Sequence, residues 1–135
     1  MAKKILVVDD EPGFVELLTG ILAAKGYAVS SASDGRQAIT MVNKDMPGLI
    51  ILDIKMPHMS GYDVCRILRD NRSFKDIPII MLTAMAELDN VKTGMSLGAV
   101  SYISKPFEQN TLLAMIHGLI GPGGEGTPGE AEDAH

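Results

Sequence analysis

The sequence predicts an α/β fold of the doubly wound sandwich type, because strand-like and helix-like segments alternate along it five times. Short runs rich in β-branched residues and leucine mark the strands, at residues 5–8, 28–32, 49–52, 79–82 and 101–104. The first, third and fourth runs are apolar throughout, which indicates strands buried on both faces of a parallel sheet. Parallel strands joined through helices imply right-handed crossovers.

The first three segments between the runs carry helix start and stop signals. Pro12 suits a first helical turn and Gly26 a stop. Asp34 or Ser33 can cap a second helix, and Ser60 can cap a third. Apolar residues follow at helical spacing: Phe14, Leu17, Leu18, Ile21 and Leu22 in the first helix, Ala38, Ile39 and Val42 in the second, and Val64, Ile67 and Leu68, facing inward, in the third.

The last two helices are expected over residues 87–97 and 108–120. The fourth has a weaker pattern, with Gly94 inside it and Gly98 after it, whereas Leu112, Leu113, Ile116 and Leu119 lie on one face of the fifth. The composition then changes to GPGGEGTPGEAEDAH, which is rich in glycine, proline and acid. We therefore expect one folded domain over residues 1–120 and, over residues 121–135, a disordered tail or a truncated linker.

Composition limits the classes of function. The 135 residues carry a net charge of −5 and no basic cluster, which argues against direct nucleic-acid binding. Cys65 is the single cysteine, so no internal disulfide can form and a reducing compartment is favoured. The apolar runs are too short to span a bilayer, and the N-terminal run ends in acids, unlike a signal peptide. These features predict a cytoplasmic protein without membrane contact.

Three adjacent acids, Asp9, Asp10 and Glu11, follow the first apolar run, and Asp53 follows the third. Ligands bind at the carboxyl ends of strands in such sheets, and these tips adjoin if the first, third, fourth and fifth strands are neighbours. Carboxylates this close repel one another unless a cation lies among them. Mg²⁺ prefers oxygen ligands, which Asp9, Asp10, Asp53 and the Lys55 backbone carbonyl can supply.

The other two strand tips carry groups that suit a phosphoryl group. Thr83 and Ala84 end the fourth run, and Lys105 followed by Pro106 ends the fifth. A carboxylate can act as a nucleophile and form an aspartyl phosphate. Lys105 could then pair with one phosphoryl oxygen while the Thr83 hydroxyl donates to another.

Four motifs, LVVDDE, LDIKMPHMSG, MLTA and YISKPF, resemble in order and spacing the receiver domain of two-component response regulators, including chemotaxis receivers. The resemblance covers about residues 3–120. It implies a flavodoxin-like (βα)5 sandwich with five parallel strands in the order 2-1-3-4-5. It also implies a phosphoacceptor, and not an enzyme proper, that receives a phosphoryl group from a sensor histidine kinase or a histidine phosphotransfer protein with Mg²⁺ or Mn²⁺ as cofactor.

The resemblance also gives roles to individual residues. Asp53 would accept the phosphoryl group, and Asp9 and Asp10 would help to hold the metal. Thr83, Ala84 and Lys105 would bind the phosphoryl group, and the bond from Lys105 to Pro106 would be cis. Tyr102 would be the aromatic residue that turns inward when Thr83 moves toward the phosphoryl group.

Two further positions bear on how long the phosphoryl group lasts. In the family the positions of Lys55 and Met85 influence how water reaches the phosphoryl group. Neither residue has a carboxylate or amide that could orient the attacking water, so we expect slow autodephosphorylation.

Signalling implies a downstream protein target or an output domain missing at the C-terminal side. The segment GAVSY at residues 98–102 and the absence of Lys and Arg from residues 107–120 do not support the charged dimer face of winged-helix regulators. The surface of the fourth helix, fifth strand and fifth helix is largely uncharged, which suits an apolar partner.

Three other functions fit the sequence less well than a phosphoacceptor does. An aspartate-nucleophile phosphatase usually carries a second Asp, two residues after the nucleophile, as its acid/base. Lys55 occupies that position here, which counts against a phosphatase. A nucleotide- or flavin-binding protein would carry a phosphate-cradling glycine loop after the first strand, and none is present. A protein-binding module that works without phosphorylation has no need to keep repelling carboxylates together.

Overall fold

The computed structural model describes residues 3–84 and 101–123, without the side chains of residues 83 and 84. The helix expected over residues 87–97, its neighbouring glycines and Met85 therefore lie outside the described residues, as does most of the expected tail, residues 124–135.

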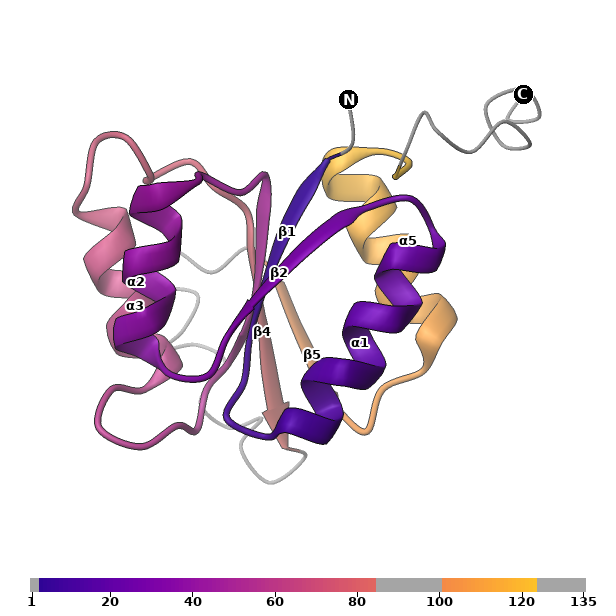
Figure 1. Cartoon of the computed structure of the whole chain (residues 1–135), viewed down its shortest axis with the longest axis horizontal. Coiled ribbons are helices and arrows are strands. Elements are labelled where there is room, and N and C mark those ends of the chain that lie inside the picture. The colour runs from indigo at the N-terminus through magenta and orange to yellow at the C-terminus, as the bar shows by residue number, and fades with distance from the viewer. Residues whose placement is uncertain (1–2, 85–100, 124–135) are drawn as a thin grey trace.

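Five parallel strands form one sheet, which runs through the middle of the molecule (Figure 1). The strands are β1 (Lys4–Val8), β2 (Ala28–Ala32), β3 (Leu49–Asp53), β4 (Ile79–Ala84) and β5 (Ser101–Lys105). Their order is β2-β1-β3-β4-β5. The fold class and the strand order are thereby confirmed, and the carboxyl ends of β1, β3, β4 and β5 adjoin along one edge.

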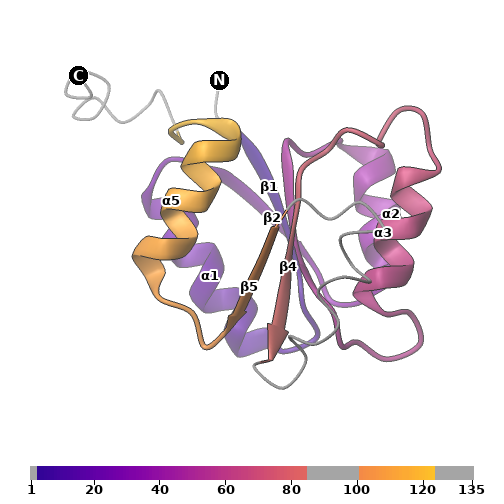
Figure 2. The same ribbon diagram turned by 180° about the vertical axis from the view of Figure 1, so that it is seen from behind.

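Helices cover both faces of the sheet. The described helices are α1 (Pro12–Ala24), α2 (Gly35–Lys44), α3 (Gly61–Arg69) and α5 (Gln109–Ile120). Figures 1 and 2 show α1 and α5 on one face and α2 and α3 on the other. A separate apolar core fills each interface, and Ile5, Val7, Ile51 and Leu82 point into one while Leu6, Val8, Ile50 and Met81 point into the other. Burial on both faces explains why apolar residues follow one another without alternation at residues 5–8, 49–52 and 79–82.

The helix caps follow the local sequence. Pro12 opens α1, where its missing N–H costs nothing. Of the two candidate caps of α2, Asp34 is the cap, because its carboxylate accepts from the backbone N–H of Gln37 at 2.7 Å. Ser60 caps α3 in a reciprocal capping box, in which Asp63 accepts from the Ser60 backbone N–H at 3.0 Å.

One core prediction on α3 is wrong. Val64 and Leu68 are buried as expected, but Ile67 is 43% exposed. The buried arc of α3 also includes Cys65, so its centre is turned away from Ile67, which falls at the margin of the arc. The spacing of apolar residues predicts a helix face but not where that face ends.

The chain continues onto the fold after α5. The Tyr27 hydroxyl donates a hydrogen bond of 2.7 Å to the Gly121 carbonyl oxygen. Gly123 is buried so closely against the Lys25 carbonyl that a side chain would not fit there. Residues 121–123 thus cover the corner between α1 and β2.

Within the described residues, no helix has the length and apolar character needed to cross a membrane.

Candidate functional site

The strand tips bring three aspartates together. Asp9 follows β1 and Asp53 ends β3, and these strands are paired in register, with Val8 opposite Leu52. Asp9 and Asp53 are buried, whereas Asp10 is exposed. One carboxylate oxygen from each of the three lies within 4.8 Å of the others. The expected cluster therefore forms at the carboxyl edge of the sheet.

Lys105 reaches into this cluster from the end of β5. Its Nζ lies 2.8 Å from Asp9 Oδ2, 3.6 Å from Asp53 Oδ1 and 3.3 Å from Glu11 Oε1. The other Asp9 oxygen, Oδ1, accepts from the backbone N–H of Glu11 at 3.0 Å. Asp9 is therefore fixed on both sides, while the contact from Lys105 to Asp53 is longer than a hydrogen bond.

Burial and like charge act on Asp53. Burial is the largest cause that raises the pKa of this carboxyl, and the Asp9 charge adds to it. Lys105 lowers the pKa and Asp10 raises it, with a net value of about 6 against an ordinary 3.8. For Lys105, burial acts to lower the pKa, but the hydrogen bond to Asp9 and the Asp53 charge raise it overall. The site therefore penalises a charged Asp53 and stabilises a charged Lys105.

The acid cluster fits a hard divalent cation. Its ligand atoms are carboxylate oxygens, and Asp10 stays open to solvent, which suits an ion that keeps part of its water shell. Lys55 lies in the loop after β3, two residues beyond Asp53, at the same edge of the sheet. These residues offer the donor chemistry that a magnesium site requires.

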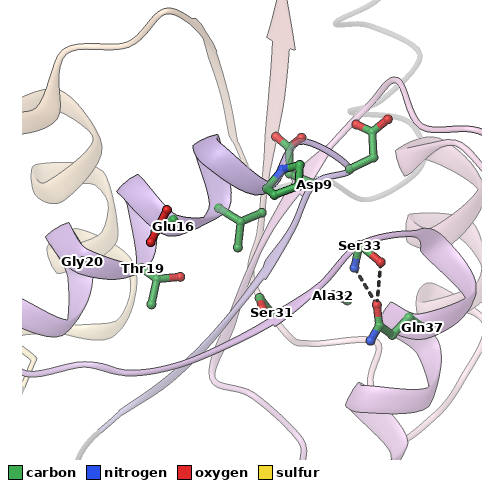
Figure 3. Close-up of a pocket in the computed structure, with 11 residues that line it drawn as sticks. Asp9, Glu16, Thr19, Gly20, Ser31, Ala32, Ser33 and Gln37 are labelled. Atoms are coloured by element: carbon green, nitrogen blue, oxygen red, sulfur yellow. Dashed lines mark hydrogen bonds between the residues drawn. The ribbon is translucent and has the colours of Figure 1, made fainter.

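A groove of about 600 Å³ runs from the acids between α1 and the end of β2 (Figure 3). Hydroxyl and amide groups line its far wall, where the backbone N–H and the hydroxyl of Ser33 both donate to Gln37 Oε1 at 2.7 and 2.9 Å. Glu16 adds a further acid, and the described residues that line the groove include no lysine or arginine. On this side of the cluster, a solvent cation can balance the charge of Asp10.

The remaining predicted residues end the last two strands. Thr83 and Ala84 lie opposite Ser104 and Lys105 in the register of β4 and β5, although the Thr83 side chain lies outside the described part of the chain. Tyr102 is partly buried on β5, and burial, followed by the neighbouring Tyr62, raises the pKa of its hydroxyl. The peptide bond between Lys105 and Pro106 is cis.

Two aromatic residues at the site were not predicted to act there. The Lys105 Nζ lies over the ring of Phe14, 4.4 Å from its centroid. The Phe14 ring meets that of Phe107 edge to face, with centroids 5.7 Å apart. In the sequence, Phe14 stands out only as part of the apolar pattern of α1. Its position one turn after the acids, on the helix that shares a face of the sheet with α5, is the signal that could have placed it here.

The chain matches the response regulator receiver domain over residues 5–117. A probable transcriptional regulator, ycf27, of Cyanophora paradoxa is 45% identical over 118 residues, which are 87% of this chain and 48% of that protein. The DNA-binding response regulator MtrA of Mycolicibacterium smegmatis is 41% identical over 120 residues, 89% of this chain and 51% of that protein.

Solved structures of proteins of this kind are also similar to the chain. The chemotaxis protein CheY4 of Vibrio cholerae superposes with a TM-score of 0.84 at 32% identity, covering 89% of this chain and all of that one (100%). The receiver domain of a signal transduction histidine kinase from Syntrophus aciditrophicus gives 0.82 at 34% identity, covering 88% and 90% of the two chains.

The chain therefore belongs to the family of response regulator receiver domains, which act in two-component signal transduction. It spans about half the length of the curated relatives it matches.

Proposed function

We propose that this domain is a phosphoacceptor that receives a phosphoryl group on Asp53 from a sensor histidine kinase or a histidine phosphotransfer protein. The observation that carries the proposal is the position of the buried Asp53 carboxylate, which shares a possible cation site with Asp9 and Asp10 and lies 3.6 Å from Lys105. A carboxylate in this setting has a cationic neighbour on one side and room for a metal on the other.

In the proposed step, an Asp53 carboxylate oxygen attacks the phosphorus atom of a phosphohistidine. The new P–O bond forms as the P–N bond breaks, and the electron pair of that bond returns to the imidazole nitrogen of the donor. Lys105 pairs with one phosphoryl oxygen, and the Thr83 hydroxyl and the Ala84 backbone N–H donate to others. Asp9, Asp10, Asp53 and the Lys55 carbonyl would hold Mg²⁺ or Mn²⁺, which would neutralise charge on the phosphoryl oxygens.

Phosphorylation then changes the surface around β5, α5 and the segment before β5. We propose that Thr83 moves toward the phosphoryl group, that Tyr102 turns inward and that the population of conformers shifts. The readout is either a separate protein target or an output domain in a longer regulator. Two of the relatives are named as transcriptional or DNA-binding regulators, so in such a protein the other half would contact DNA, with no direct nucleic-acid contact by this acidic domain.

The lifetime of the phosphoryl group belongs to the same proposal. Lys55 and Met85 offer no carboxylate or amide to orient water, so autodephosphorylation is slow, and the transfer itself is catalysed by the domain. Its cytoplasmic location would place it where a kinase domain can reach it, and the single, buried Cys65 is compatible with a reducing compartment.

Intact mass after incubation with acetyl phosphate and Mg²⁺ tests the proposal. We expect the parent to gain the mass of one phosphoryl group and Asp53→Asn to gain none. Asp70→Asn, which removes an exposed acid at the end of α3, is the matched control and should behave as the parent does. No gain in the parent would favour a binding module that works without phosphorylation.

A further inference from the structure

Lys105 is held by an aromatic ring as well as by acids. The carboxylates of Asp9 and Glu11 lie within 3.3 Å of its Nζ, and the face of Phe14 lies 4.4 Å away, centroid to nitrogen. A lysine ammonium within about 6 Å of a ring centroid is attracted by the ring's negative face. The Lys105 side chain is only 20% exposed, so this attraction acts with little competition from water.

The ring itself is held in place. Phe107 follows Pro106 directly after β5 and meets Phe14 nearly perpendicular, at 84°. Edge-to-face pairs of this kind are a favoured aromatic arrangement. Both rings belong to a groove that also includes Leu17, Ile21 and Lys105, between α1 and the start of α5. The orientation of Phe14 is thus set by its neighbours before any ligand binds.

This arrangement limits where the ammonium can go. In the described state Nζ is bound to Asp9 at 2.8 Å and stands 3.6 Å from Asp53 Oδ1. A phosphoryl group on Asp53 would need the ammonium to turn toward that carboxylate without leaving the site. The hydrogen bonds from Nζ to Asp9 and Glu11 must lengthen in such a movement. The attraction to the Phe14 ring can persist, because it acts up to about 6 Å from the ring centroid and Nζ lies at 4.4 Å.

From this geometry we infer that Phe14 is a positioning residue for phosphotransfer, which keeps the Lys105 ammonium beside Asp53 through a cation–π contact. The inference rests on the proposed phosphoacceptor role. The competing explanation is that Phe14 only fills space between α1 and the chain after β5. Leucine would fill most of that space without a ring face, whereas tyrosine keeps the ring.

The first measurement concerns the free protein and needs no phosphorylation. In the parent, the Lys105 Hε protons should show an upfield ring-current shift by NMR, with the signal assigned from Lys105→Arg. The shift should disappear in Phe14→Leu and persist in Phe14→Tyr. Hε protons at ordinary shifts in the parent would overturn the contact and the inference with it.

The second measurement is the rate of mass gain over a range of acetyl phosphate concentrations with Mg²⁺. Loss of the contact in Phe14→Leu should lower the maximal rate by about two- to tenfold, and Phe14→Tyr should restore it. Leu17→Ala is the matched control, because Leu17 lies in the same groove and is 57% exposed; its rate should equal that of the parent.

Two results would overturn the positioning role. Equal rates in the parent and Phe14→Leu would leave the contact without an effect on transfer. Equal slowing in Phe14→Leu and Phe14→Tyr would assign the effect to packing and not to the ring face. If the parent itself takes up no phosphoryl group, the proposed function fails and the role in transfer with it, while the NMR shift still reports separately whether the contact exists.

Discussion

At the scale of single residues, Asp53 is a buried acid whose surroundings disfavour its charged form. Burial and two neighbouring acids oppose its charge, and the strand that places it there cannot move away, because β3 is fully buried between its neighbours. The same features that make the carboxylate a candidate phosphoacceptor therefore cost stability when no cation is bound. Binding sites commonly keep such a cost where function needs it.

The pKa of Asp53 predicts how this cost depends on pH. Since the pKa is raised from 3.8 to about 6 on folding, the folded state binds the proton more tightly than the unfolded chain does. The contribution of Asp53 to stability is therefore largest below about pH 4, decreases as the pH rises to about 6, and stays low above that. Asparagine resembles the protonated acid, so Asp53→Asn should stabilise the fold at pH 7 by about 1 to 3 kcal/mol.

Urea unfolding of the parent and Asp53→Asn in EDTA, at pH 4 and at pH 7, checks this prediction. The difference between the two proteins should be large at pH 7 and small at pH 4. Asp70→Asn serves as the control for loss of one acidic charge. A difference that does not change with pH would show that Asp53 titrates normally in the fold.

At the scale of the elements, the start of α3 fixes the loop that follows Asp53. Ser60 accepts a hydrogen bond from the backbone N–H of Asp63, and Asp63 accepts one in return. Ser60→Ala removes one side of this capping box and should lower the free energy of unfolding by about 1 kcal/mol. Ser60→Thr keeps the hydroxyl acceptor and should lose little. Chemical denaturation checks both, and equal losses in the two variants would mean that the cap hydroxyl is not what stabilises this end of the helix.

At the next residue, Gly61, a substitution should lower the stability of the fold more than Ser60→Ala does. A Cβ at this position would overlap the Asp53 carbonyl oxygen and lie 3.0 Å from the Ile54 Cα, and backbone atoms cannot turn aside. Gly61→Ala should therefore destabilise the fold by about 2 kcal/mol or more and, because it displaces Asp53, slow phosphorylation by acetyl phosphate.

The matched control for that substitution is Gly118→Ala in α5, where nothing lies within 4 Å of the added carbon. Alanine favours the helix there, so this variant should gain up to about 1 kcal/mol. Denaturation curves and phosphorylation rates measured side by side separate the close approach at Gly61 from a general effect of alanine. A Gly61→Ala protein as stable as the parent would show that α3 can shift freely from β3.

The elements also show what local sequence can and cannot predict. Three strands were predicted because continuous apolar runs have few alternatives. Ser60 was predicted as a cap because capping depends on neighbouring residues, whereas the choice between Ser33 and Asp34 stayed open until the structure showed Asp34 as the cap. Ile67 was misplaced because helical spacing gives the direction of a buried face but not its width. The strand order came from the family resemblance, since the alternation of strands and helices does not set it.

At the scale of the whole molecule, the site exists only because distant segments meet. The acids come from β1 and β3, and Lys105 comes from the far end of the chain on β5. Sequence could predict that these residues share an edge, because parallel strands align their carboxyl ends. It could not predict that the Phe14 ring lies against Lys105 and is itself packed by Phe107, because these contacts depend on how side chains from different segments pack.

A metal ion that binds the folded state and not the unfolded chain should stabilise the entire domain. We expect the melting temperature of the parent to rise with Mg²⁺ concentration, by an amount equivalent to about 2.7 kcal/mol at one hundred times the dissociation constant. Asp10→Asn should respond much less, because it removes the exposed ligand of the acid cluster. Thermal scans in Mg²⁺ and in NaCl of matched ionic strength check this, and an equal response to both salts would exclude a specific cation site.

The central claim is that Asp53 accepts the phosphoryl group, and chemical mapping of that group tests it most directly. The protein would be incubated with Mg²⁺ and phosphoramidate, whose P–N bond imitates that of phosphohistidine, and then reduced with borohydride, which converts an aspartyl phosphate into homoserine. Peptide mass spectrometry should find homoserine at position 53 and unmodified aspartate at positions 9 and 10. Unmodified Asp53 in a phosphorylated protein, or homoserine at another position, would contradict the claim.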